Sequence, residues 1–152
     1  MRVFTKLPLR HWREAAPAAQ AAETAGFDAV MTVELGHDVF TPLAFAALAT
    51  QRIELTPSIA VAFPRSPTIL AHQAWDLHAN SSGRFVLGLG VSHIPMVEGL
   101  RGHRYDKPVA TMRAYLEALH KGLPADRAAP VVVAALGPRM RSEEHTSELQ
   151  SH

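Results

Sequence analysis

Residues 54–90, ELTPSIAVAFPRSPTILAHQAWDLHANSSGRFVLGLG, contain the unit that decides the fold. An apolar run with β-branched residues, 52–63, leads into a helical stretch, 66–84, and then into a second apolar run, 84–92. Ser66 and Pro67 suit the start of that helix and Gly83 suits its end. Because both runs are apolar without alternation, we predict two strands buried on both faces, parallel and joined by the helix.

The same alternation continues in both directions from this unit. Gly26 stands where a helix-ending glycine is expected, and Met112, Tyr115, Leu116 and Leu119 form one apolar stripe of a later helix. We expect further strands at 1–9, 27–34 and 129–137, and further helices at 12–27, 41–50 and 108–122. Five strands that alternate with helices predict an α/β protein with a parallel sheet. Periodicity by itself leaves a doubly wound sheet and a (β/α) barrel equally open.

The composition excludes several classes of protein. The chain has 152 residues, about one domain, and no cysteine, so we expect no disulfide, thiol nucleophile or thiolate metal site. Its net charge is +1 and its basic residues are scattered, which argues against nucleic-acid binding. His72 and His78 lie on different faces of their helix, so no metal pair is expected. There is no long apolar span and no signal-peptide pattern, which favours a cytoplasmic location away from membranes.

Candidate chemistry gathers where the predicted strands end, since parallel α/β folds bind ligands at the carboxyl ends of their strands. Glu34, His37 and Asp38 follow the second strand, and Ser92 and His93 follow the fourth. A histidine beside a carboxylate could move protons. Glu34 could equally be a capping or salt-bridge carboxylate, the pair after it could cap the next helix, and His93 could be a surface-loop residue.

Two glycine-containing segments complete the set of strand ends. The GLG of residues 88–90 could allow a helix to pack close to its strand. It does not continue into the dinucleotide-binding pattern, because His93 stands where that pattern needs glycine. Backbone amides at Gly137 and its neighbours could hold a phosphate before a following helix.

Four segments together resemble the luciferase-like monooxygenase superfamily, and within it the oxidoreductases that use the deazaflavin coenzyme F420. They are AAETAGFDAVMTVE (21–34), the quoted 54–90 segment, MRAYLEAL (112–119) and VVVAALGPRM (131–140). The resemblance covers residues 1–140 and implies a truncated TIM (β/α)8 barrel with about its first five strands. It implies hydride transfer between F420 and a small organic substrate, and a possible homodimer of the full-length enzyme. The alternatives are an FMN-dependent monooxygenase of the same superfamily and a non-catalytic half-barrel that binds a second chain.

The resemblance also implies roles for individual residues. It places a non-proline cis peptide bond at Ser58–Ile59, in a bulge behind the cofactor ring. The residues it assigns to cofactor binding are Ser58, Ile59, Ala60, Val91, Ser92, Leu136 and Gly137, the last two at the phosphate. The residues it assigns to substrate orientation and proton movement are Glu34, His37 and His93.

This sequence departs from the family pattern in three places. Many F420 members have an Asp-His pair after the second strand, and a gapless match puts Glu34 and Leu35 there, with His37 as a possible substitute for the histidine. The segment before Val131 is short, KGLPADRAAP. Residues 141–152, RSEEHTSELQSH, resemble a translated sequencing adapter, so we expect an artefactual tail and an inactive fragment. The alternative for that tail is a natural disordered segment.

Overall fold

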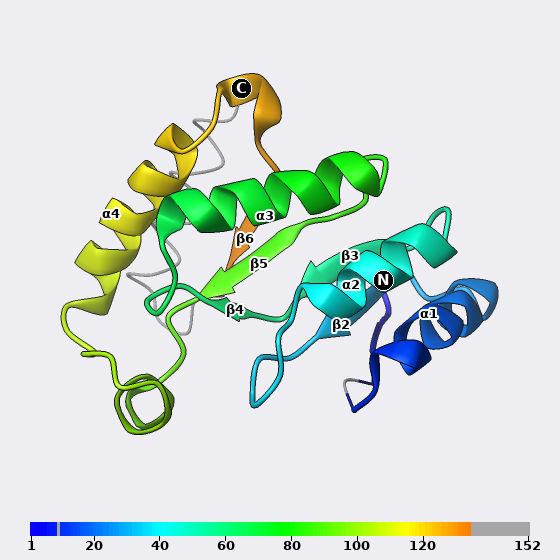
Figure 1. Cartoon of the computed structure of the whole chain (residues 1–152), viewed down its shortest axis with the longest axis horizontal. Coiled ribbons are helices and arrows are strands. Elements are labelled where there is room, and N and C mark those ends of the chain that lie inside the picture. The colour runs from blue at the N-terminus through cyan, green and yellow to red at the C-terminus, as the bar shows by residue number, and fades with distance from the viewer. Residues whose placement is uncertain (9, 135–152) are drawn as a thin grey trace.

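The computed structural model describes residues 1–8 and 10–134, and it contains the predicted strands and helices in the predicted order (Figure 1). The strands are β1 (Phe4–Lys6), β2 (Ala29–Thr32), β3 (Glu54–Pro57), β4 (Ala60–Val61), β5 (Leu87–Gly90) and β6 (Val131–Val133). The long helices are α1 (Ala15–Thr24), α2 (Thr41–Ala49), α3 (Pro67–Asn80) and α4 (Pro108–Lys121). Three short helices, η1 (Trp12–Glu14), η2 (Pro95–Leu100) and η3 (Ala125–Arg127), lie in the connections; η2 is a π-helix.

The third predicted strand differs from its prediction. Residues 52–63 do not form one strand: β3 ends at Pro57, β4 begins at Ala60, and the peptide bond between Ser58 and Ile59 is cis. The cis bond lies where the family resemblance placed it. Apolar periodicity cannot show such an interruption, because the residues on both sides of it are equally apolar.

All strand pairs are parallel, and within each sheet every strand pairs with its neighbours in the chain, whereas β3 and β4 do not pair with each other. One sheet has the order β1-β2-β3 and the other β4-β5-β6. A parallel bridge between Leu55 and Phe85 joins β3 to the start of the next sheet. A doubly wound sheet reverses its strand order at a switch point, whereas a (β/α) barrel keeps its strands in sequence. The α/β class with parallel strands is therefore confirmed, and neither sheet shows the reversed strand order of a doubly wound sheet.

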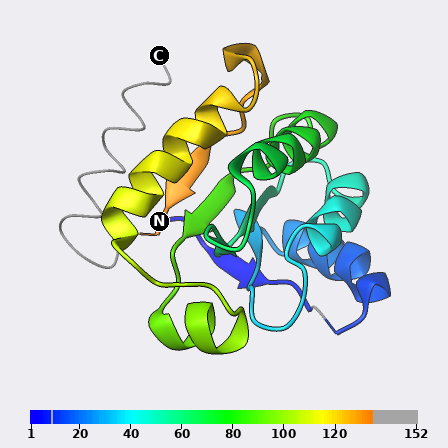
Figure 2. The same ribbon diagram turned by 60° about the vertical axis from the view of Figure 1, so that its left-hand side comes forward.

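The helices form a layer that follows the strands, with α1 against α2, α2 against α3 and α3 against α4 (Figure 2). The predicted α4 stripe is confirmed, since Met112, Tyr115, Leu116 and Leu119 are all buried. Burial on both faces holds for β5, whose four residues are all buried. It is wrong for β3, in the 52–63 run, where half-buried and buried residues alternate. The outer strands, for which burial on both faces was not predicted, are partly exposed: Phe4 of β1 is 43% exposed and Val132 of β6 is 51% exposed.

The glycines of β5 are explained by the neighbouring strand. A Cβ on Gly88 would stand 2.0 Å from the carbonyl oxygen of Pro57 at the end of β3. Real Cβ atoms do not approach a backbone oxygen so closely, so only glycine fits here. The interpretation that these glycines let a helix approach the strand is therefore wrong for Gly88, because a strand backbone makes the close contact.

Arg84 joins three elements at the amino-terminal end of β5. Its guanidinium donates to the carbonyl oxygens of Ser81 (2.8 Å), Ile53 (3.0 Å), Ala47 (2.8 Å) and Thr50 (3.1 Å), and to the Thr50 hydroxyl (2.9 Å). The carbonyls of Ala47 and Thr50 lie at the end of α2, where a helix leaves its acceptors unpaired. Arg84 thus connects the end of α2, the start of β3 and the turn after α3.

Candidate functional site

Four strand ends meet at one edge of the molecule, which we call the mouth: residues 33–34, 58–62, 90–93 and Ala134. Three backbone hydrogen bonds hold these ends together. The N–H of Ser58 donates to the carbonyl of Thr32 (2.7 Å), that of Ala62 to Gly90 (2.9 Å), and that of Ala134 to Leu89 (2.8 Å). The structure therefore brings the candidates after the second, third and fourth predicted strands to one place. Leu136 and Gly137, the candidate phosphate-binding residues, lie outside the described residues.

The cis bond between Ser58 and Ile59 lies among the strand ends of the mouth. Ser58 is exposed, Ile59 is half-buried and Ala60 is buried. A Cβ on Gly90 would stand 2.6 Å from Cδ1 of Ile59, so the Ile59 side chain lies directly against the backbone of β5. The result is an apolar platform made from one side chain and the glycine backbone beside it.

The segment after β5 turns sharply away from the sheet. Val91 is buried, and Ser92 has a left-handed backbone with φ of 61°, a conformation that is uncommon for residues other than glycine. The carbonyl of His93 then accepts hydrogen bonds from the N–H groups of Met96 and Val97, both 3.0 Å, which begins η2. The His93 side chain itself is exposed beside the mouth.

Glu34 is a buried carboxylate just after β2, and both of its oxygens already accept hydrogen bonds. Its Oε2 accepts from the N–H of Val61 (2.8 Å), and both oxygens accept from Nη1 of Arg65 (2.9 and 2.8 Å). Its Oε1 also accepts from Nη1 of Arg101 at 2.7 Å. The side chains of Glu34, Arg65 and Arg101 are only 6%, 20% and 15% exposed. The salt-bridge alternative for Glu34 is the observed geometry, and a role in proton movement stays a prediction.

The loop from Val33 to Phe40 holds the other two candidates that follow β2. Oδ2 of Asp38 accepts a hydrogen bond from the N–H of Thr41 at 2.6 Å, so the capping interpretation is confirmed for Asp38. Burial by itself would raise the pKa of Asp38, but the hydrogen bonds from Thr41 and Phe40 and the charge of Arg65 lower it overall. His37 is exposed in the same loop.

Sequence reasoning missed both arginines of this site. Arg65 follows β4 within the quoted FPRSP segment, and its guanidinium also lies 5.5 Å from the ring centre of Phe40. Arg101 lies 67 residues from Glu34 along the chain. A basic residue just before a predicted helix was a weak signal for Arg65. No sequence pattern pointed to Arg101, because the loop that carries it has no periodicity.

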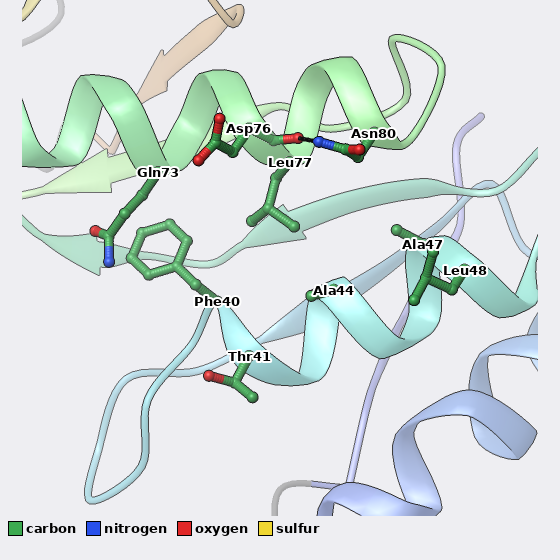
Figure 3. A pocket seen from close by; sticks show the side chains of 9 residues that line it. All are labelled: Phe40, Thr41, Ala44, Ala47, Leu48, Gln73, Asp76, Leu77 and Asn80. Atoms are coloured by element: carbon green, nitrogen blue, oxygen red, sulfur yellow. Dashed lines mark hydrogen bonds between the residues drawn. The ribbon is translucent and has the colours of Figure 1, made fainter.

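A separate cleft of about 430 Å³ lies between α2 and α3 in the helix layer (Figure 3). Gln73, Asp76 and Asn80 line it from α3, and Ala44 and Leu48 line it from α2. None of the strand-end candidates lines this cleft, so it is distinct from the mouth. In the described part of the chain, no helix is long and apolar enough to cross a membrane.

The strands are parallel and sequential, with a cis bulge and polar side chains at their carboxyl ends, the edge at which parallel α/β folds bind their ligands. The family model for luciferase-like monooxygenase matches residues 1–143, and the chain belongs to this family.

Its relatives among curated proteins include two from Mycobacterium tuberculosis. Rv1360, which is uncharacterized, is 46% identical over 105 residues, covering 69% of this chain and 31% of the relative. Rv3520c, provisionally named a coenzyme F420-dependent oxidoreductase, is 45% identical over 102 residues, covering 66% of this chain and 29% of the relative. The matched part of the chain therefore spans about a third of the length of these relatives.

Solved structures share the fold at low sequence identity. The F420-dependent tetrahydromethanopterin reductase of Methanopyrus kandleri has a TM-score of 0.75 at 19% identity, over 93% of this chain and 52% of that one. The 3,6-diketocamphane monooxygenase of Pseudomonas putida, in complex with FMN, has a TM-score of 0.66 at 20% identity, over 80% of this chain and 39% of that one. Neighbours in the family fold thus include both F420-dependent and FMN-dependent enzymes.

Proposed function

We propose that this sequence belongs to an oxidoreductase that transfers hydride between coenzyme F420 and a small organic substrate, with the cofactor ring at the mouth. The observation that carries the proposal is the platform of Ile59 against Gly90 beside the cis bond. A flat heterocycle needs an apolar surface of this kind on one face and polar groups at its rim. The F420 name of the relative Rv3520c supports the choice of cofactor.

The residues of the mouth fit such a group in a consistent way. Ser58, Ile59 and Ala60 would support one face of the ring, and Val91 and Ser92 would line its edge. When bound, the deazaflavin would supply the hydride chemistry. What this chain supplies is a bulge that excludes water from one face and a shape that orients the ring.

Proton movement in the proposal falls to the exposed histidines. His93 stands at the mouth and His37 in the loop after β2, and both side chains are exposed and accessible to a substrate. A histidine within reach of a bound substrate can give or take a proton during turnover. Glu34 has both oxygens engaged, so we assign substrate protonation to His93 first.

The test is a binding titration of the chain with F420 and, separately, with FMN. We expect F420 to bind, and Ile59→Ala to weaken binding by roughly tenfold because the platform is lost. The matched control is Ile69→Ala, since Ile69 is an exposed isoleucine on α3. Binding of FMN in place of F420 would favour the monooxygenase alternative. Absence of binding by either would refute the proposal for this chain.

We further propose that residues 1–140 supply about the first five strands of a (β/α)8 barrel and that residues 141–152 are an artefactual tail. The sequential strand order and the exposed outer strands support the first point. One long sequencing read of the source DNA across codon 140 tests both. A reading frame that continues into a helix and further strands supports the barrel and an active enzyme, whose proposed homodimer can then be tested on the full-length protein. A frame that encodes RSEEHTSELQSH and stops favours the non-catalytic half-barrel.

A further inference from the structure

One buried and two part-buried charges behind the mouth link segments that are far apart in the chain. Glu34 lies two residues after the end of β2, Arg65 lies between β4 and α3, and Arg101 directly follows η2. Figure 2 shows η2 and the loop that follows β2 at the same end of the molecule. We call Glu34, Arg65 and Arg101 the clasp. It joins two of the strand ends that form the mouth to the helical segment beside it.

The position of Arg101 is explained by Glu34. Nε of Arg101 is buried and has no hydrogen-bond partner among the described residues. A buried donor without a partner lowers the stability of the folded state. Burial of Arg101 is therefore favourable only through the contacts of its Nη1 and Nη2 atoms. Those contacts are the 2.7 Å ion pair from Nη1 to Oε1 of Glu34 and the longer bond, 3.3 Å, from Nη2 to the Glu34 carbonyl.

Most of the other hydrogen bonds of the η2 segment are local. The N–H of His103 donates to the carbonyl of Val97 (3.0 Å), and the N–H of Tyr105 donates to the Glu98 carboxylate (3.0 Å). Such bonds shape the segment but do not fix it to the sheet. The contacts that reach beyond the segment are the ion pair of Arg101 with Glu34 and the ring contact of Tyr105 with Phe63 at 6.0 Å, and Val97 of η2 is fully buried.

Arg65 has a different part in the clasp. Its Nη1 also donates to the carbonyl of Val61, four residues earlier, at 2.8 Å. The carboxylate of Asp38, in the loop after β2, also interacts electrostatically with the Arg65 guanidinium. Arg65 is therefore held locally and keeps Glu34 in place, whereas Arg101 is the partner that reaches across from another segment.

We propose that Arg101 is a positioning residue: through Glu34 it holds residues 95–101 as a fixed wall of the mouth, and this wall sets the affinity for the bound cofactor. The second half of this inference rests on the proposed function. The first half does not, because the wall can be observed without any ligand.

The first measurement is hydrogen–deuterium exchange on the full chain without ligand. Arg101→Gln should accelerate exchange at the amides of Met96, Val97 and His103 by roughly tenfold or more, while the amides of β2 stay unchanged. The matched control is Arg104→Gln, which removes the same charge from an exposed arginine of the same loop and should change neither. Arg101→Lys keeps the charge and should restore part of the protection. Unchanged exchange in Arg101→Gln would overturn the clasp.

The second measurement is the Kd of whichever cofactor the parent chain binds. Arg101→Gln should raise this Kd by roughly tenfold, and Arg101→Lys should recover part of the loss. Faster exchange with an unchanged Kd would refute the positioning role and leave a purely structural ion pair. A parent chain that binds neither F420 nor FMN would refute the proposed function, and the exchange result would then decide the clasp alone.

Discussion

Replacing Arg84 with methionine tests whether one guanidinium holds the amino-terminal ends of the strands to the helix layer. Methionine keeps most of the apolar stem but removes all five hydrogen bonds to backbone carbonyls and the Thr50 hydroxyl. Burial lowers the pKa of Arg84, opposed by the charge of Glu23, so the guanidinium is partly desolvated. Its removal therefore leaves carbonyl oxygens at the end of α2 and after α3 without a charged donor.

The expected loss of stability follows from the number of acceptors left behind. A hydrogen bond to a charged group contributes about 1.5–3 kcal/mol, but Arg84 is only part-buried and water can replace some of its contacts. At about 1 kcal/mol for each of the four carbonyls, we expect Arg84→Met to lower the free energy of unfolding by about 3–5 kcal/mol. That is a large part of the total stability of a domain of this size, which is typically about 5–15 kcal/mol.

The assay is urea unfolding of the full chain, followed by the combined fluorescence of Trp12 and of Trp75 on α3. Arg84→Lys, with fewer donors and no planar fork, should fall between the parent and Arg84→Met. Arg13→Met is the control at an exposed arginine and should stay within about 0.5 kcal/mol of the parent. If Arg84→Met lies within about 1 kcal/mol of the parent, the reasoning that this side chain ties the three elements together is wrong.

Further substitutions probe the strand ends and the acidic side chains. Gly88→Ala should destabilise the chain by more than about 3 kcal/mol, because its Cβ would meet a backbone oxygen, whereas Gly90→Ala meets only a side-chain end and should cost about 1–3 kcal/mol in thermal unfolding. Burial acts to raise the pKa of Glu23, but three backbone N–H bonds and a nearby arginine lower it overall from 4.5, so its stabilisation is present above that pH and is lost as the pH falls below it. The Tm difference between the parent and Glu23→Gln should therefore shrink below about pH 4, and a constant difference would contradict this. Asp38→Ala should lower stability by about 1 kcal/mol through loss of the cap of α2, and Asp38→Asn by less, as measured in urea.

Much of the fold could be predicted from local patterns. The helices opened by proline and closed by glycine, and the stripe along α4, appear in the structure where periodicity placed them. These features depend on neighbours within a few residues, which the sequence displays directly. The cis bond at Ser58–Ile59 was found only through family resemblance, since nothing in its local composition distinguishes it from a continuous strand.

In the candidate site, too, the sequence predicted some features and only the tertiary structure showed the others. The sequence placed Glu34 and His93 at strand ends, and parallel strands necessarily bring such residues to one edge. It did not show that Glu34 is enclosed by Arg65 and Arg101, nor that Gly88 faces the carbonyl of another strand. Those contacts join residues 31 to 67 positions apart, so their partners are chosen by the packing of whole elements. By itself the sequence determined which segments are strands and helices, because that depends on local periodicity. Only the tertiary structure decided that Glu34 is an ion-paired anchor, because burial and charge pairing depend on residues that distant segments bring together.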